Sequence, residues 1–188
     1  ASEEIKAICG DCKVGVSFSR PSPNETWFSA IGKICSSIDF LDLHYPKVKG
    51  DSEETGLNVW KNTCSGKEFI STESGIRDDI AEGPFGGSEE EQAKDLIKYY
   101  SMIFNTGYNK IYWMLVDWDY APDVPNDAWE NYGILRADKS KKPAFYAFKE
   151  IIEKVDYFTA IIKLAEGQYK YIFSNKDPVY VLWCDTGS

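Results

Sequence analysis

The sequence predicts an α/β fold in which parallel strands alternate with helices, followed by a short antiparallel sheet. Segments typical of strands and of helices alternate four times up to residue 155, at the spacing of right-handed βαβ units. Residues 110–118 are almost continuously apolar, which is typical of a strand covered on both faces. Three short apolar segments follow within residues 158–184 and are separated by turn residues, a pattern that predicts an antiparallel meander.

The first two predicted strands each follow a predicted helix. Gly10 ends the first helix, and residues 13–18 then alternate as a strand does. Asn24 is a suitable cap for the second helix, which leads to a strand over residues 38–44.

The third and fourth helices have clear end signals. A helix over residues 53–64 ends at Gly66, and the next strand begins directly after it. Ser88 and Glu91 form a capping box at the start of the longest helix, which Gly107 ends. The spacing predicts that its buried stripe consists of Ala93, Leu96, Ile97, Tyr100, Ile103 and Phe104.

The last helix is predicted over residues 143–155. A long loop over residues 119–136 precedes it, and a proline occupies its first position, where no backbone N–H is needed. The residues predicted to point inward are Phe145, Phe148, Ile151 and Ile152.

Composition and charge exclude several classes of protein. The 188 residues, 43% of them hydrophobic, are enough for one substantial core. A net charge of −9 disfavours nucleic acid and anionic membrane surfaces as partners. No apolar run approaches the roughly 20 residues of a membrane span, and the amino terminus does not have the form of a signal peptide. Another interpretation is an unrelated α/β protein that binds a ligand at the ends of its strands. It lacks support, because the chain has no glycine motif of the kinds that bind dinucleotides or phosphate.

The five cysteines are an odd number and are scattered along the chain. This pattern does not resemble a disulfide framework, so the sequence predicts reduced thiols and favours a cytoplasmic protein. Cys9 and Cys12 have the spacing of a redox pair or of half a zinc site, but the chain has no second such pair and only one histidine, His44. Packing at a helix end is the favoured role of the pair, and no metal is predicted.

The strand over residues 67–73 ends in a carboxylate, Glu73. Glutamate is a poor strand former, and an acid at the carboxyl end of a parallel strand is often catalytic. Because side chains alternate along a strand, Glu73 is predicted to share a face with Ser71, and Thr72 is predicted to point to the other face. The alternative is a surface carboxylate that pairs with Arg77.

Three parts of the chain together resemble the retaining glycoside hydrolases that are built on a (β/α)8 barrel. They are Asp-Phe-Leu-Asp-Leu-His-Tyr-Pro (39–46), Phe-Ile-Ser-Thr-Glu-Ser-Gly (69–75), and Tyr-Trp (112–113) with Tyr-Gly-Ile-Leu-Arg-Ala-Asp (132–138) and Lys-Pro-Ala-Phe-Tyr (142–146). The resemblance implies that these are strands six to eight of such a barrel. Residues 1–156 are then expected to form its carboxyl-terminal half, and residues 157–188 the start of an accessory β domain.

The resemblance also implies roles for single residues and an activity. Glu73 matches the catalytic nucleophile, and His44 and Tyr45 match positions that orient it and contact the sugar. Trp113 matches the aromatic floor of the sugar site, and Trp118 and Trp129 are alternatives for this role. Barrel packing is the other interpretation of Trp113. The implied reaction is retaining hydrolysis of an oligosaccharide, polysaccharide or other glycoside, without a cofactor.

The chain departs from the family pattern in one important respect. The family's general acid is a glutamate, usually preceded by asparagine, at the end of strand four. Here the strands begin at what resembles strand five, and Asn24-Glu25 opens a helix instead. We therefore expect the acid to come from an amino-terminal half-barrel polypeptide, or two copies of the chain to associate into a dimer. The other interpretation is a non-catalytic carbohydrate-binding module or pseudo-glycosidase.

Overall fold

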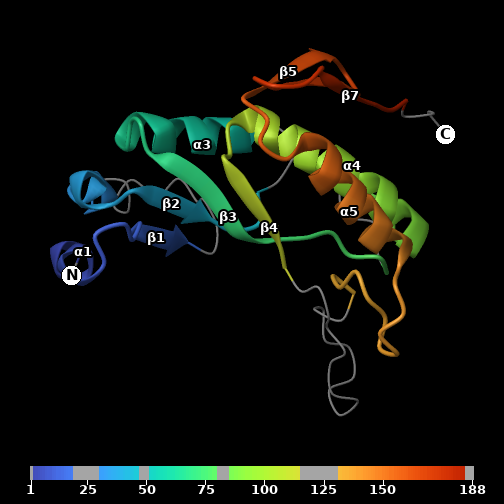
Figure 1. Cartoon of the computed structure of the whole chain (residues 1–188), viewed down its shortest axis with the longest axis horizontal. Helices are drawn as coiled ribbons and strands as arrows, with labels where there is room; N and C mark the ends of the chain where they lie inside the picture. The colour runs from blue at the N-terminus through green and yellow to red at the C-terminus, as the bar shows by residue number, and fades with distance from the viewer. Residues whose placement is uncertain (1, 19–29, 47–50, 80–84, 115–130, 185–188) are drawn as a thin grey trace. The chain divides into compact units, whose positions relative to one another are not determined.

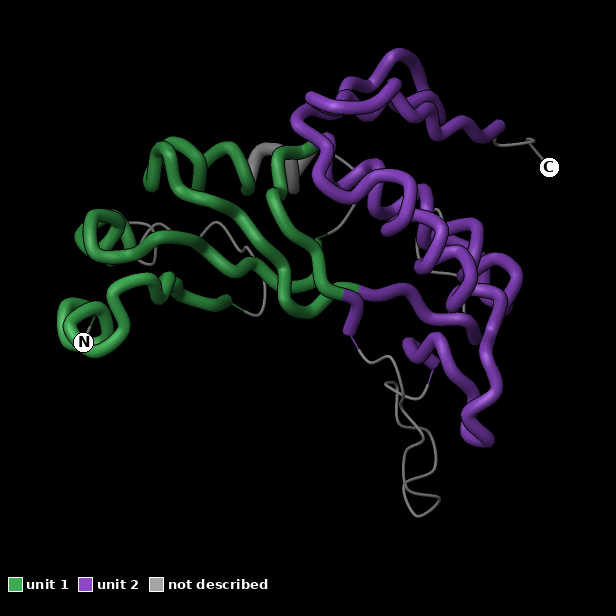
Figure 2. Tube along the Cα trace, in the orientation of Figure 1, with its two compact units in different colours: residues 1–74, 106–112 green, residues 75–105, 113–188 purple. Residues whose placement is uncertain are grey.

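The computed structural model describes five stretches of the chain, residues 2–18, 30–46, 51–79, 85–114 and 131–184. The chain forms two compact units, which Figure 2 colours separately. Unit 1 consists of Ala1–Ser74 and Thr106–Tyr112, and unit 2 of Gly75–Asn105 and Trp113–Ser188.

A four-stranded parallel sheet is the main feature of unit 1, and it confirms the predicted α/β fold (Figure 1). Its strands are adjacent in chain order, and Gly15 pairs with Phe40, which pairs in turn with Glu68. The strands are β1 (Gly15–Phe18), β2 (Phe40–Leu43), β3 (Glu68–Ser74) and β4 (Lys110–Trp113).

Helices precede β1, β2 and β3 in unit 1. They are α1 (Ser2–Ile8), the 3-10 helix η1 (Cys35–Ser37) and α3 (Asp51–Thr63). Leu57 and Trp60 of α3 are buried, and Gly66 follows with φ +76, a backbone conformation that glycine adopts easily. The helix predicted from Asn24 falls mainly on residues outside the described stretches.

The core of unit 1 includes one side of β2. Leu41 and Leu43 are fully buried. Asp42 lies between them in the sequence and so points to the opposite side of the strand, where it is only 5% exposed. A buried carboxylate requires hydrogen-bond partners, and those of Asp42 belong to the candidate site.

Helix α4 (Glu89–Thr106) of unit 2 begins where the capping signal predicts. The backbone N–H of Glu91 donates to Ser88 Oγ at 3.1 Å, and Gly107 follows the helix with φ +106. Of the predicted stripe, Leu96, Tyr100 and Ile103 are buried.

Helix α5 (Pro143–Val155) has the predicted bounds, but its buried face differs from the prediction. Ala144, Ile151 and Val155 are buried, and Ile152 is 43% exposed. Ala144, Ile151 and Val155 share one stripe at spacings of seven and four, and Ile152 lies about 100° further round the helix. The inward assignment of Ile152 is therefore wrong.

The carboxyl-terminal strands form the predicted antiparallel meander. Strands β5 (Ala160–Ala165), β6 (Gln168–Ile172) and β7 (Val179–Leu182) pair in that order. The hydroxyl of Tyr171 in β6 donates to Ser101 Oγ of α4 at 3.1 Å, so this sheet packs on α4 within unit 2. The predicted domain boundary after residue 156 stays a prediction.

The prediction of reduced cysteines is wrong, and with it the cytoplasmic assignment. Cys9 is disulfide-bonded to Cys12, and Cys35 to Cys64, while Cys184 is free and exposed. Disulfides persist in oxidising compartments and are rare in the cytosol. The prediction took the odd number of cysteines as evidence against disulfides, whereas two bonded pairs leave one cysteine free.

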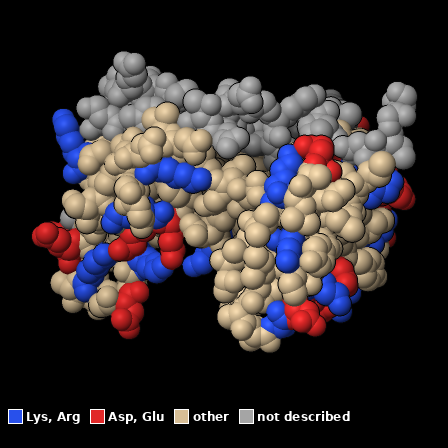
Figure 3. All heavy atoms as spheres, turned by 90° about the horizontal axis from the view of Figure 1, so that it is seen from above, with Lys and Arg blue, Asp and Glu red and all other residues tan. Residues whose placement is uncertain are grey.

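The surface of the described residues carries mixed charge. On the face that Figure 3 shows, basic and acidic side chains are interspersed, and neither kind forms a continuous patch. Among the described helices, none combines the length and the apolar content that crossing a bilayer requires.

Candidate active site

The candidate site lies at the carboxyl ends of β1, β2 and β3 in unit 1. Two backbone hydrogen bonds align these ends: His44 N–H donates to the Phe18 carbonyl at 3.0 Å, and Tyr45 N–H donates to the Glu73 carbonyl at 2.8 Å. The parallel register therefore brings residues 44 and 45 beside residue 73.

Glu73 is held by Tyr45. The tyrosine hydroxyl donates to Glu73 Oε2 at 2.7 Å, a short bond as expected for a charged acceptor. Tyr45 has φ 48, a conformation that costs a side-chain-bearing residue about 1–3 kcal/mol. The Glu73 side chain is 42% exposed, so the carboxylate is both oriented and accessible.

His44 joins Glu73 to a group of polar residues that the sequence analysis did not single out. Its Nδ1 lies 3.3 Å from Glu73 Oε2. Its Nε2 lies 3.0 Å from Asp42 Oδ2, 2.8 Å from Ser17 Oγ and 3.1 Å from Thr72 Oγ1. The imidazole is only 13% exposed, and both of its ring nitrogens lie close to polar atoms of the protein.

One signal in the sequence could have found Asp42. It is the one charged residue in an otherwise apolar strand and stands two positions before His44, which places both side chains on the same face. Ser17 and Thr72 carry no comparable signal, because small polar residues are common near strand ends.

Thr72 and Glu73 contact the same imidazole, contrary to the predicted alternation of faces. Ser71, predicted to share the face of Glu73, is fully buried and accepts a hydrogen bond from Ser74 Oγ at 2.7 Å. The Ser71 hydroxyl in turn donates to the Glu73 carbonyl at 3.0 Å. Strand β3 extends to Ser74, so these contacts are made from within the strand, and the strict period of two does not describe its last residues.

The Asp42 carboxylate is the electrostatic anchor of the cluster. Burial on its own would raise the pKa of Asp42, but hydrogen bonds from Thr72, His44 and Ser17 outweigh it and hold that pKa below its usual value. Thr72 contributes twice, through its backbone N–H at 2.8 Å and its hydroxyl at 2.6 Å. Asp42 is therefore ionised and acts only as an acceptor.

Trp113 belongs to unit 2 and is 7% exposed. Its ring stacks on Tyr100, with centroids 6.4 Å apart, and its indole N–H donates to the Tyr132 carbonyl at 2.9 Å. The packing interpretation accounts for these contacts, and a role at a sugar site stays a prediction. Trp118 and Trp129 lie outside the described stretches.

The alternative partner of Glu73, Arg77, forms a bidentate ion pair with Asp79 at 2.8 and 2.7 Å. Within the described stretches, no group of three or more acidic, histidine or cysteine side chains is arranged to hold a metal ion.

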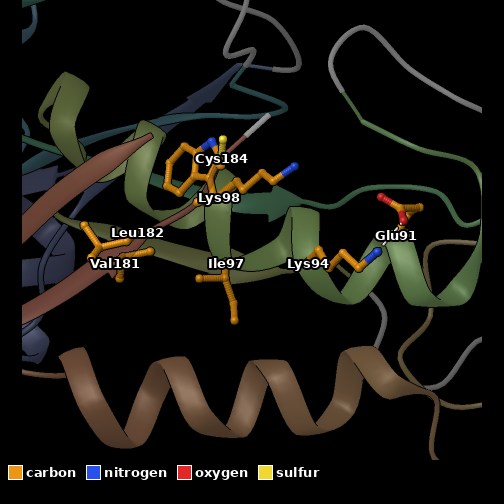
Figure 4. Close-up of a pocket in the computed structure, with 8 residues that line it drawn as sticks. Glu91, Lys94, Ile97, Lys98, Val181, Leu182 and Cys184 are labelled. Atoms are coloured by element: carbon orange, nitrogen blue, oxygen red, sulfur yellow. Dashed lines mark hydrogen bonds and ion pairs between the residues drawn. The ribbon is translucent and has the colours of Figure 1, made fainter. Parts of the chain in front are cut away.

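Unit 2 has a surface pocket of about 490 Å³ beside α4 and the end of β7 (Figure 4). It is lined by Glu91, Lys94, Ile97, Lys98, Val181, Leu182, Trp183 and Cys184. The carboxylate of Glu91 is already paired with Lys94 at 2.6 Å. This lining contains none of the candidate site residues.

No known family model and no curated protein match the chain by sequence. Its fold, by contrast, is similar to catalytic domains of glycoside hydrolases. The GH53 catalytic domain of Ignisphaera aggregans superposes with a TM-score of 0.57 at 13% identity, over 78% of this chain and 49% of that one. Xylanase 10B of Thermotoga petrophila, in complex with xylobiose, superposes with a TM-score of 0.50 at 21% identity, over 79% and 49%.

A third similar structure is an active-site mutant of a Rhizomucor miehei β-1,3-glucanosyltransferase in complex with laminaritriose. Its TM-score is 0.50 at 20% identity, over 76% of this chain and 52% of that one. This chain spans about half the length of each of these structures. It therefore has the fold of about one half of a (β/α)8-barrel glycoside hydrolase domain.

Proposed function

We propose that this chain is the carboxyl-terminal half of a retaining glycoside hydrolase and that Glu73 is its nucleophile. The observation that carries the proposal is the position of Glu73: a half-exposed carboxylate at the carboxyl end of a parallel strand, oriented by Tyr45 and flanked by His44. Catalytic groups of (β/α)8 enzymes lie at this end of the strands.

The hydrogen bonds of Glu73 indicate which oxygen would react. Oε2 accepts from Tyr45 and faces His44, and among the described residues none donates to Oε1. In the proposed mechanism, Oε1 attacks the anomeric carbon and the leaving group departs with a proton from a general acid. Water then cleaves the glycosyl ester on Glu73. The tyrosine hydrogen bond stabilises the negative charge before attack and after hydrolysis.

The general acid must come from outside the cluster around Glu73. Asp42 is the other carboxylate of that cluster, but four hydrogen bonds stabilise its ionised form, and an acid catalyst has to be protonated before it reacts. We propose that an amino-terminal half-barrel polypeptide supplies the acid, or that two copies of the chain associate. Either arrangement would also pair the edge strands β1 and β4 of the sheet.

For the substrate we propose an oligosaccharide or polysaccharide. Two of the similar structures were determined with bound sugars, xylobiose and laminaritriose. We propose that His44 and Tyr45 contact both the sugar and Glu73. Trp113 and Trp118 stay candidates for its aromatic floor.

A glycosyl fluoride with fluorine also at C2 tests the nucleophile without the general acid, because fluoride departs unprotonated and the fluorinated ester accumulates. The full chain is incubated with such reagents of gluco, xylo, manno and galacto configuration, digested, and analysed by mass spectrometry. We expect the adduct on Glu73, unchanged in Glu68→Gln at the other end of β3 and lost in Glu73→Gln.

An adduct on another residue would reject Glu73 as the nucleophile. Oligosaccharide binding by a chain that no reagent labels would favour the non-catalytic carbohydrate-binding interpretation. Sedimentation velocity tests the missing half separately. A concentration-dependent dimer supports self-association, whereas a stable monomer to which no amino-terminal half-barrel polypeptide binds counts against both arrangements.

A further inference from the structure

The hydrogen bonds around His44 determine which of its ring nitrogens carries the proton. Asp42 is buried and ionised, so both of its oxygens only accept hydrogen bonds. The Thr72 hydroxyl has a single proton, and it donates that proton to Asp42 Oδ2 at 2.6 Å. Thr72 Oγ1 therefore presents only lone pairs to His44 Nε2, 3.1 Å away.

The two remaining neighbours of Nε2 are consistent with this assignment. Asp42 Oδ2, at 3.0 Å, accepts. The Ser17 hydroxyl, at 2.8 Å, also hydrogen-bonds Asp42, so it donates its proton there and accepts from the ring. All three neighbours of Nε2 are then acceptors, and Nε2 must carry a hydrogen.

The other ring nitrogen faces Glu73. Nδ1 lies 3.3 Å from Glu73 Oε2, and in the neutral ring with hydrogen on Nε2 it presents a lone pair. Glu73 Oε2 accepts a hydrogen bond from Tyr45, and a proton that forms on this carboxylate has the Nδ1 lone pair beside it as an acceptor. After that transfer both ring nitrogens are donors, with Asp42 as the counter-charge.

We propose that Asp42 is a positioning residue, which holds His44 in the Nε2–H tautomer and so directs a basic Nδ1 at Glu73. Its role is to keep the nucleophile free of a proton, and this role rests on the proposed function of Glu73. The tautomer itself does not rest on that function and is measured separately.

A purely structural role is the competing explanation, because Asp42 also ties β2 to β3 through Thr72. The variant Asp42→Asn distinguishes the positioning role from the purely structural role. The Thr72 backbone N–H still needs an acceptor, so the asparagine carbonyl takes the place of Oδ1. The amide NH2 then faces His44 Nε2 as a donor. Nε2 becomes an acceptor, and the ring hydrogen moves to Nδ1, where it donates to Glu73.

Nuclear magnetic resonance measures the tautomer of His44 directly, because His44 is the sole histidine of the chain. Long-range 1H–15N spectra of the full 15N-labelled chain, recorded at a pH where the ring is neutral, show which nitrogen is protonated. We expect Nε2–H in the wild type, Nε2–H in the control Ser17→Ala, which keeps Asp42, and Nδ1–H in Asp42→Asn. Backbone amide spectra verify that each variant is folded.

A wild type with hydrogen on Nδ1, or with a mixture of tautomers, would overturn the proposal, and this measurement needs no variant to fold. A folded Asp42→Asn chain that keeps Nε2–H would overturn it as well. If the glycosyl fluorides label another residue while the tautomer reverses as expected, the function of Glu73 is wrong and the positioning by Asp42 stands.

Discussion

Opening the disulfide between Cys35 and Cys64 is expected to destabilise the chain strongly. The two cysteines are 29 residues apart. The entropy that a cross-link of this span removes from the unfolded chain corresponds to about 3.5 kcal/mol. The Cys9–Cys12 disulfide spans only 3 residues and is expected to contribute about 2 kcal/mol or less. The larger effect also bears on the site, because Cys35 and Cys64 lie shortly before β2 and β3, which carry His44 and Glu73.

The measurement uses the variant Cys9→Ala/Cys12→Ala, in which the disulfide between Cys35 and Cys64 is the remaining one. Urea unfolding is followed by circular dichroism with and without reductant. With a denaturant slope of about 2 kcal/mol per molar, reduction is expected to lower the midpoint by about 2 M. Alkylation of the oxidised chain is expected to modify Cys184 alone. A loss of stability below about 1 kcal/mol on reduction would refute the reasoning.

Three further outcomes are expected. Tyr45→Phe removes the hydrogen bond that orients the Glu73 carboxylate, so labelling of Glu73 by the reagents above should slow about tenfold through loss of that orientation. An unchanged rate would count against the assigned role. Asp78→Asn leaves Lys142 buried and unpaired and should cost about 3 kcal/mol in urea unfolding, while Asp78→Leu/Lys142→Met should recover most of it. The pKa of Asp42 is lowered in the folded state, so its contribution to stability is present above about pH 4 and is lost as pH falls further. The difference in the free energy of unfolding between wild type and Asp42→Asn should therefore shrink in acid. A pH-independent difference would contradict this.

The elements that the sequence predicted well are those with local signals. Ser88 and Gly107 mark the ends of α4, and the proline at position 143 marks the start of α5, because caps and helix breakers act within one turn. The position of Glu73 at a strand end was predictable for the same reason. Ile152 was misplaced because neighbouring apolar residues leave the centre of a helical stripe uncertain.

The disulfides could not be read from the sequence, since pairing depends on contacts between distant segments. Cys35 and Cys64 come together because η1 leads into β2 and α3 leads into β3, and these two strands are neighbours in the sheet. Parallel strands place the segments before them at the same edge. The spacing of 29 residues is thus that of one βαβ unit rather than of a small disulfide scaffold.

The polar cluster depends on the register of three strands, which is why no single segment reveals it. Ser17 is the direct register partner of Asp42, and both hydrogen-bond the imidazole of His44, two residues further along β2. Thr72 completes the cluster from β3. A shift of one residue between β1 and β2 would move the Ser17 hydroxyl to the opposite face of the sheet and remove an acceptor from Nε2. The same hydrogen bonds that define the environment of Glu73 therefore also stabilise one register, so the arrangement of the site and the pairing of the sheet are specified together.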